Sequence, residues 1–413
     1  MIRSMFTAIS SLSLQQKYLD VVSNNLANAN TMGFKASRVL SQDQFSQMMS
    51  PGSAPTATQG GVNPTQIGLG VNLGYISANF TQGVLQSTGR NMDLGVQGDG
   101  FFIYGNENRR YSREGSMSLD MEGNLVNSAS GLRTQGWMAA SGVIDTDLPV
   151  DDINIVTDKT LAQATSNVIL GGNLSSTTAA AGTNVISMGV YDSLGALQTA
   201  SITFTRGSSA APVLPTNTWN WAVTSSPAGA SGGGTVTFDA GGQVTGSTVG
   251  AGTPVTILGS AGSAALTPII DFTKLTQLAS ANSATVTSQD GLPAGNVTDV
   301  YISPNDGVIS LMYSNGMSEQ VGQVALARFN NPSGLMKGED TSFLAGLNSG
   351  DAQIGAASTG GRGSIAASYL EASNVDMAQE FTNMILAQRG FQASSRVITT
   401  SDEILQELVN LKR

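Results

Sequence analysis

The last forty residues, 374–413, read NVDMAQEFTNMILAQRGFQASSRVITTSDEILQELVNLKR and contain no Pro and a single Gly, Gly390. An apolar residue recurs every seventh position, and Phe381 widens the stripe; the set is Met377, Phe381, Met384, Phe391, Ile398 and Leu405. A repeat of seven residues sustained over this length is typical of a helix that packs along another long helix. We expect Ser373 or Asn374 to cap its N-terminus, since both side chains can accept a hydrogen bond from the first helical turn.

The beginning of the chain carries the same repeat. Its heptad positions are Met5, Leu12, Leu19 and Leu26. One interpretation is that the two segments are unrelated amphipathic helices on one globule. The interpretation we favour is that the first and last segments pair as a coiled coil, so that the rest of the chain is nested between them. We call the two sets together the heptad residues. We expect them to form the contacts through which subunits assemble.

The segment between the two helices is dominated by short alternating strands separated by Gly, Asn and Asp turns. This pattern favours antiparallel hairpins. The predicted fold class is therefore mixed but mainly β, with nested all-β domains and N- and C-terminal α-helices that pair. We expect a helical coiled-coil domain from 1–30 and 370–413, an extended connector over 31–71, an inner β-domain from 72–145 and 291–369, and an outer β-domain inserted at 146–290.

Composition excludes several classes of function. The 413 residues carry a net charge of −10 with no Lys/Arg cluster, which argues against nucleic-acid binding. The chain has neither Cys nor His, so the commonest metal ligands and general bases are missing; we expect no enzyme activity, no metal and no cofactor. Ser and Thr interrupt the apolar residues near the N-terminus, and no apolar run of about eighteen residues occurs, so we expect neither a cleaved signal peptide nor membrane insertion.

Two terminal signatures point to a family. An Asn-rich stretch follows the first heptads, and a second string opens and continues the last helix; their positions are Asn25, Asn28, Thr31, Gly33, Phe34, Lys35, Asn374, Val375, Gln388 and Arg389. Both strings, in this order, resemble the termini of the bacterial flagellar axial family of rod and hook subunits. The resemblance covers roughly residues 1–140 and 297–413. The large central insert is more typical of hook-type than of rod-type subunits.

The resemblance implies a structural subunit of the flagellar hook that polymerises with itself into a flexible helical tube and transmits torque from motor to filament. It also implies contacts with flagellar rod, hook cap and hook-filament junction proteins. The expected location is extracellular, in the flagellum, after passage through the type III export apparatus. A rod-type subunit is the main alternative; a secreted β-rich adhesin and a carbohydrate-active enzyme are two further ones.

Overall fold

The computed structural model describes residues 2–56, 58–207, 217–225, 229–249, 255–259 and 262–410. The chain divides into two compact units. Unit 1 comprises Met1–Val156, Val300–Ser310 and Gln320–Arg413, and unit 2 comprises Thr157–Asp299 and Leu311–Glu319. The outer insert predicted from the sequence, 146–290, overlaps the first segment of unit 2.

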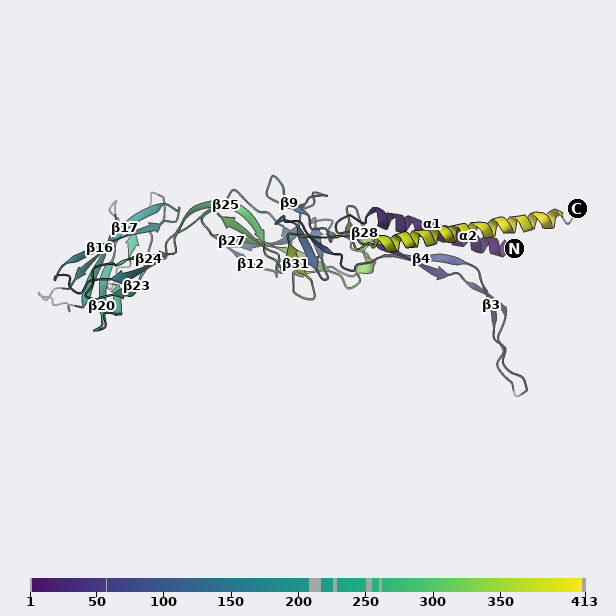
Figure 1. Cartoon of the computed structure of the whole chain (residues 1–413), viewed down its shortest axis with the longest axis horizontal. Coiled ribbons are helices and arrows are strands. Elements are labelled where there is room, and N and C mark those ends of the chain that lie inside the picture. The colour runs from purple at the N-terminus through teal and green to yellow at the C-terminus, as the bar shows by residue number, and fades with distance from the viewer. Residues whose placement is uncertain are drawn as a thin grey trace. The chain divides into compact units, whose positions relative to one another are not determined.

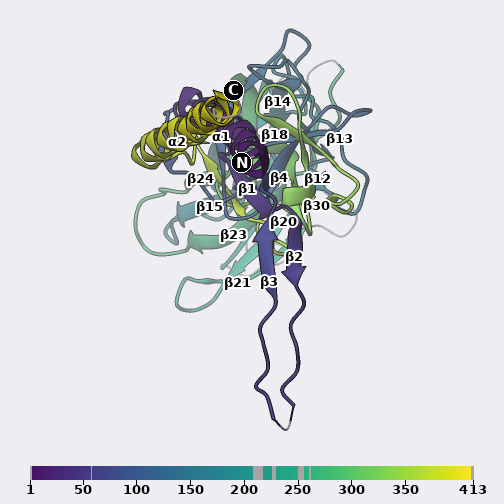
Figure 2. The same cartoon turned by 90° about the vertical axis from the view of Figure 1, so that its right-hand side faces the viewer.

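Two long helices, both in unit 1, lie at the ends of the described chain. They are α1, Ile2–Ala27, and α2, Met377–Asn410. The helices lie side by side in both views (Figures 1 and 2), which confirms the predicted pairing of the two chain ends. The predicted N-caps of the last helix were wrong: Asp376 caps α2, because its Oδ1 accepts hydrogen bonds from the amides of Ala378 and Gln379 at 2.9 and 3.1 Å.

Three strands and the first residue of a fourth lie in the segment 31–71, for which the sequence predicts an extended connector. Strand β1, Ser37–Asp43, pairs with β4, Val71–Ala78, and β2, Ser46–Ser50, pairs with β3, Thr65–Gly68. Figure 2 shows β2 and β3 running side by side as a two-stranded ribbon. Every residue of β2 and β3 is exposed, so no alternation between buried and exposed residues marks them as strands in the sequence.

The rest of unit 1 is a β-domain whose strands come from both sides of unit 2 in the sequence. Its core residues are Phe101, Ile103, Tyr111, Trp137, Val150, Ala325, Ala327, Phe329 and Phe343. Strand β27 pairs antiparallel with β7, β11 and β30, so the two halves of the sequence form one sheet. The strands not yet given are β5 Leu85–Ser87, β6 Leu94–Gln97, β7 Phe101–Tyr104, β8 Arg110–Ser112, β9 Met117–Leu119, β10 Leu125–Asn127, β11 Gln135–Ala140, β12 Val143–Ile144, β13 Asp151–Asp152, β28 Met336–Lys337, β29 Ser342–Leu344, β30 Gln353–Ala356, β31 Ser364–Ala367 and β32 Tyr369–Glu371, with a short 3-10 helix at Pro332–Gly334. The division between the units falls within β25 Leu292–Ile302, β26 Val308–Tyr313 and β27 Ser318–Arg328.

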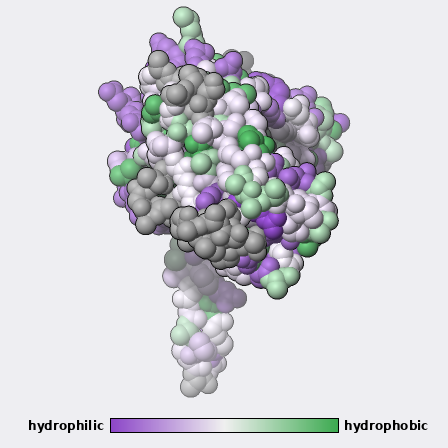
Figure 3. All heavy atoms as spheres, turned by 90° about the vertical axis from the view of Figure 1, so that its left-hand side faces the viewer, coloured by the Kyte–Doolittle hydropathy of each residue, from purple (hydrophilic) through white to green (hydrophobic). Residues whose placement is uncertain are grey.

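Unit 2 is all β in its described residues. A five-stranded antiparallel sheet has the order β16-β17-β18-β20-β21, and a three-stranded sheet has the order β23-β15-β24. Trp219, Trp221, Phe204 and Phe272 are among the buried residues of a single core that side chains of both sheets share. Its strands are β14 Thr160–Gln163, β15 Asn167–Asn173, β16 Thr183–Tyr191, β17 Leu197–Arg206, β18 Thr218–Ser225, β19 Ala230–Ser231, β20 Gly233–Phe238, β21 Val244–Val249, β22 Thr256–Ile257, β23 Ile269–Thr276 and β24 Thr285–Gln289. The face seen in Figure 3 is a mixture of hydrophilic, intermediate and scattered apolar side chains where it is coloured.

Candidate assembly site at the joined chain ends

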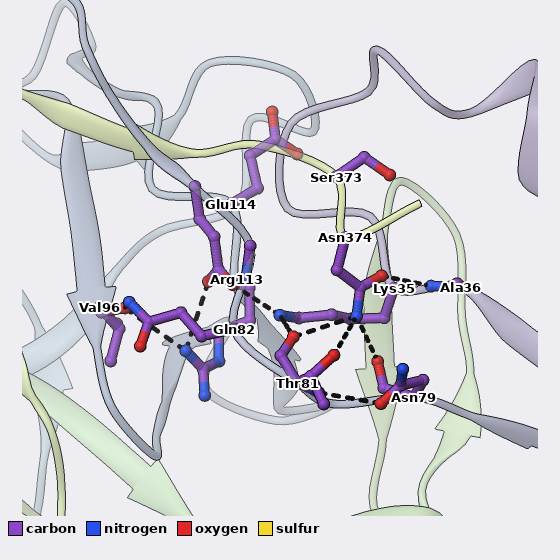
Figure 4. Close-up of polar contacts among 12 residues, drawn as sticks. Lys35, Ala36, Asn79, Thr81, Gln82, Val96, Arg113, Glu114, Ser373 and Asn374 are labelled. Carbon is purple, nitrogen blue, oxygen red and sulfur yellow. Dashed lines mark hydrogen bonds and ion pairs between the residues drawn. The ribbon is translucent and has the colours of Figure 1, made fainter. Parts of the chain in front are cut away.

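The chain leaves α1 and enters α2 through one buried polar cluster. Lys35 follows α1, and Glu371 ends β32, just ahead of α2. The Lys35 ammonium donates to Oε1 of Glu371 at 2.6 Å and to the carbonyl oxygen of Thr81 at 2.8 Å. Both charged side chains are fully buried. Figure 4 shows Lys35 and Asn374, which follow α1 and precede α2, lying close together beside Thr81.

A second cation completes the cluster. Arg113 donates to Oε2 of Glu371 at 3.3 Å and is 3% exposed, and the Gly83 amide donates to Oε1 at 2.7 Å. Burial lowers the pKa of both Lys35 and Arg113, and Glu371 opposes each shift. Because one carboxylate balances two buried cations, removal of its charge would leave both cations uncompensated. We call Lys35, Arg113 and Glu371 the buried triad.

Asn374 links the same region through its amide group. Its Oδ1 accepts from the amide of Ala36 at 2.8 Å, and its Nδ2 donates to the carbonyl oxygens of Asn79 and Thr81 at 2.8 and 3.0 Å (Figure 4). The side chain that the sequence offered as a helix cap therefore serves the backbone of the β-domain. This arrangement ties the segment before α2 to the segment after α1.

Asn25 and Gly33 fix the path of the chain after α1. Asn25 is buried and forms two hydrogen bonds with the backbone of Ser37, at 2.8 and 2.9 Å. Gly33 has a φ of 71°, and its amide donates to the carbonyl oxygen of Glu371 at 2.7 Å. A Cβ on Gly33 would lie 2.6 Å from the amide nitrogen of Glu114, so this turn excludes larger residues.

The other signature residues have more local surroundings. Asn28 accepts from the Thr31 hydroxyl at 3.1 Å, and Phe34 is buried with the Lys337 ammonium 4.9 Å from its ring centroid. Val375 is half-buried, whereas Gln388 and Arg389 are exposed on α2. The structure thus brings Asn25, Gly33, Phe34, Lys35 and Asn374 to the junction and leaves Gln388 and Arg389 on the helix surface.

Small residues line the contact between α1 and α2. Ala8, Ala387 and Ser401 are buried, and the hydroxyls of Ser11 and Ser394 lie 2.9 Å apart. Small side chains let two helices approach closely, and they leave the bulkier residues around the edge of the contact.

The heptad residues are half-buried or exposed. The half-buried members are Met5, Leu12, Leu19, Leu26, Met384, Ile398 and Leu405. Met377, Phe381 and Phe391 are exposed, at 51, 51 and 40%. Phe6, Ile385 and Leu386 add to the exposed apolar surface of the helix pair. This surface is the kind that a further helix covers.

Two residues of the buried triad were missed by sequence reasoning. Glu371 stands in the string that opens the last helix, and Arg113 lies among the predicted hairpins. The sequence did hold a signal for a carboxylate partner. Charged residues make up only 12% of the chain, and a buried Lys35 requires a carboxylate. Spacing along the chain could not single out which carboxylate, because 336 positions separate Lys35 from Glu371.

The described residues hold no group of three His, Cys, Asp or Glu side chains placed to bind a metal ion. None of the described helices has the length and apolarity that a membrane span needs. The junction joins two helices to a β-domain through buried charges and backbone hydrogen bonds.

Three family models match the chain. They are described as flagella basal body rod protein, over residues 5–35, flagellar basal body protein FlaE D2 domain, over 157–292, and flagellar basal body rod FlgEFG protein C-terminal, over 366–411. The first and last include the segments that meet at the buried triad, and the middle one lies within unit 2.

Several relatives that match over their whole length are flagellar hook proteins, and one is the flagellar basal-body rod protein FlgG of Bacillus subtilis, which is 29% identical over 100% of each chain. The chain is 39% identical to the flagellar hook protein FlgE of Borreliella burgdorferi and 35% identical to that of Treponema pallidum, in both cases over 100% of each chain. It is 32% identical to the flagellar hook protein FlgE of Salmonella typhimurium, over 98% of this chain and 99% of the relative. These matches contradict the adhesin and carbohydrate-active enzyme alternatives. The chain belongs to the family of flagellar hook proteins FlgE, which are structural, non-enzymatic subunits of the hook.

Proposed function

We propose that this chain polymerises with itself, through the heptad residues and their exposed apolar neighbours, into the flexible helical tube that carries torque from the flagellar motor to the filament. The observation that carries the proposal is the apolar surface that the packed helix pair leaves exposed, which includes Phe381 and Phe391. Burial of apolar surface stabilises an assembly by about 25 cal/mol per Å², and a tube repeats the gain at every subunit.

The junction suits a subunit that must transmit force. Each helix is fixed to the β-domain by charged and amide side chains that are buried or partly buried. A load applied to α1 or α2 therefore reaches the β-domain through several bonds in parallel, and not through one strand of backbone. We propose that the inner part of the tube is built by the helices and that the β-domains, including the predicted outer insert at 146–290, govern how the tube bends.

Contacts with rod, hook cap and hook-filament junction proteins, and passage through the type III export apparatus to the cell exterior, belong to the same proposal. They rest on family membership. A tube subunit at either end of the hook must meet a different protein, and its exposed helix surface is the natural contact.

The main alternative is a rod-type subunit, because the two terminal models are named for rod proteins. The match of residues 157–292 to the FlaE D2 domain and the full-length hook relatives favour the hook. The two functions predict different polymers, since a rod is straight whereas a hook curves.

The decisive experiment is polymerisation of the purified full chain. Protein is concentrated stepwise, sedimented, and the pellet is imaged by electron microscopy. Curved tubes support the hook proposal, and straight rigid rods support the alternative. A chain that stays monomeric at all concentrations, with its helices intact by circular dichroism, contradicts both.

A further inference from the structure

A groove of about 530 Å³ lies among α1, α2, β1 and β4, close to the junction but separate from the buried triad. The residues that line it include Tyr18, Ser37, Arg38, Phe80, Glu380 and Asn383. It is large enough for the end of a long side chain, and its lining combines an aromatic wall with polar groups.

Glu380 is the unusual member of the lining. Its Oε1 accepts a hydrogen bond from Asn25 at 3.3 Å. Its Oε2 is buried and has no hydrogen-bond partner among the described residues. Burial raises the pKa of Tyr18, and the negative charge of Glu380 adds to that shift. A buried carboxylate oxygen without a donor is costly, so a donor that entered the groove would stabilise this side chain.

No described residue donates a hydrogen bond to this oxygen. Arg38 lines the groove but is exposed and forms no ion pair with a described carboxylate. Basic side chains that could fill the groove do exist on the helices: Lys17, Arg389 and Arg396 are exposed and are likewise unpaired with carboxylates in the described structure.

We propose that this groove is a docking site for a basic side chain from the helix pair of a neighbouring copy, with Glu380 as its counter-ion. The inference rests on the proposed polymerisation and adds an electrostatic contact to an otherwise apolar interface. A Lys or Arg would donate to the free Oε2, and its aliphatic stem would pack beside Phe80. The apolar surface gives the interface its stability, and the ion pair fixes how neighbouring helices are aligned.

The test compares Glu380→Gln with Glu403→Gln, in the full chain. Both remove one negative charge from α2, but Glu403 is exposed and does not line the groove. Gln keeps the oxygen that Asn25 contacts. We expect the critical concentration for polymerisation, measured by sedimentation, to rise about tenfold or more in Glu380→Gln, which corresponds to about 1.4 kcal/mol or more, because the variant loses a hydrogen bond between two charged groups. Glu403→Gln should polymerise like the wild type.

Salt dependence gives a second readout. The critical concentration of the wild type should rise with NaCl, and this dependence should flatten in Glu380→Gln. The melting temperature and helix content of the monomer should not fall in this variant, because it removes an incompletely satisfied buried charge.

Three outcomes would overturn the proposal. Wild-type polymerisation by Glu380→Gln with an unchanged salt dependence would show that the groove is not an ionic contact. If Arg38→Gln raised the critical concentration as much as Glu380→Gln does, the cation that pairs with Glu380 would be Arg38 of the same chain. Loss of wild-type polymer on addition of EDTA would assign the site to a metal ion. Failure of the wild type to polymerise under any condition would instead contradict the proposed function.

Discussion

Replacing Glu371 with Gln should loosen both helices from the β-domain. The substitution keeps the size of the side chain and one oxygen but removes the charge that Lys35 contacts at 2.6 Å and Arg113 at 3.3 Å. Both cations are almost completely buried, so water cannot take the place of the carboxylate. Removing one partner of a buried ion pair typically costs about 3–5 kcal/mol, a large part of the roughly 5–15 kcal/mol that stabilises a domain.

A matched control is available in the same unit. Glu339 contacts Arg110 at 3.3 Å, the same distance as that between Arg113 and Glu371, but its side chain is 81% exposed. Glu339→Gln should therefore change the free energy of unfolding by less than about 1 kcal/mol.

The assay is denaturant unfolding followed by circular dichroism at a helical wavelength. Both described α-helices belong to unit 1, so this signal reports the unit that carries the triad. Limited proteolysis should in parallel release the first and last segments of Glu371→Gln earlier than those of the wild type. Lys35→Met combined with Glu371→Gln should cost less than the sum of the two single changes, because the double variant leaves only one uncompensated cation. If Glu371→Gln unfolds at the same denaturant concentration as Glu339→Gln, the triad does not hold the chain ends together.

Three further predictions follow from single positions. Gly33→Ala should destabilise unit 1 by about 1–3 kcal/mol, measured by the same unfolding assay, because a Cβ would lie 2.6 Å from a backbone nitrogen at a φ of 71°; an unchanged midpoint would contradict the tight turn. Phe391→Asp should abolish polymerisation, measured by sedimentation and microscopy, because it places a charge in the expected contact. The monomer should melt like the wild type, since Phe391 is 40% exposed. Gln392→Asp should weaken polymerisation less, and equal assembly by both variants would show that Phe391 is not in the contact. Burial, together with its hydrogen bond to Glu319, raises the pKa of Tyr313 to about 12, so the folded state keeps this proton at a pH where the unfolded state has lost it. The stability of unit 2 should therefore fall as pH rises from about 10 to 12. Tyr313→Phe should reduce that fall in thermal melts, and a fall of the same size in the variant would show that Tyr313 does not cause it.

The helices and hairpins could be predicted from the sequence because local patterns encode them. A seven-residue apolar repeat in a stretch free of Pro favours a long helix, and two such repeats at opposite ends predicted the pairing of α1 and α2. Turns such as Asn315-Gly316 could likewise be predicted, because the Asn-Gly pair is typical of a tight turn, and in the structure Gly316 adopts a φ of 85°. The paired strands at 37–50 and 65–78 gave a weaker signal because much of their surface is exposed.

The tertiary structure decided which groups meet. The signature residues were visible in the sequence, but only the fold shows Glu371 between Lys35 and Arg113, at separations of 336 and 258 positions. The repeat also did not reveal which side of each helix faces its partner within the chain. Small residues such as Ala387 and Ser394 form that contact, whereas Phe391 is exposed. Two helices can approach closely only where their side chains are small, and a pattern of apolar positions does not encode side-chain size. Local periodicity therefore determined the elements, whereas burial of charge and the fit of side chains across large sequence separations determined the junction.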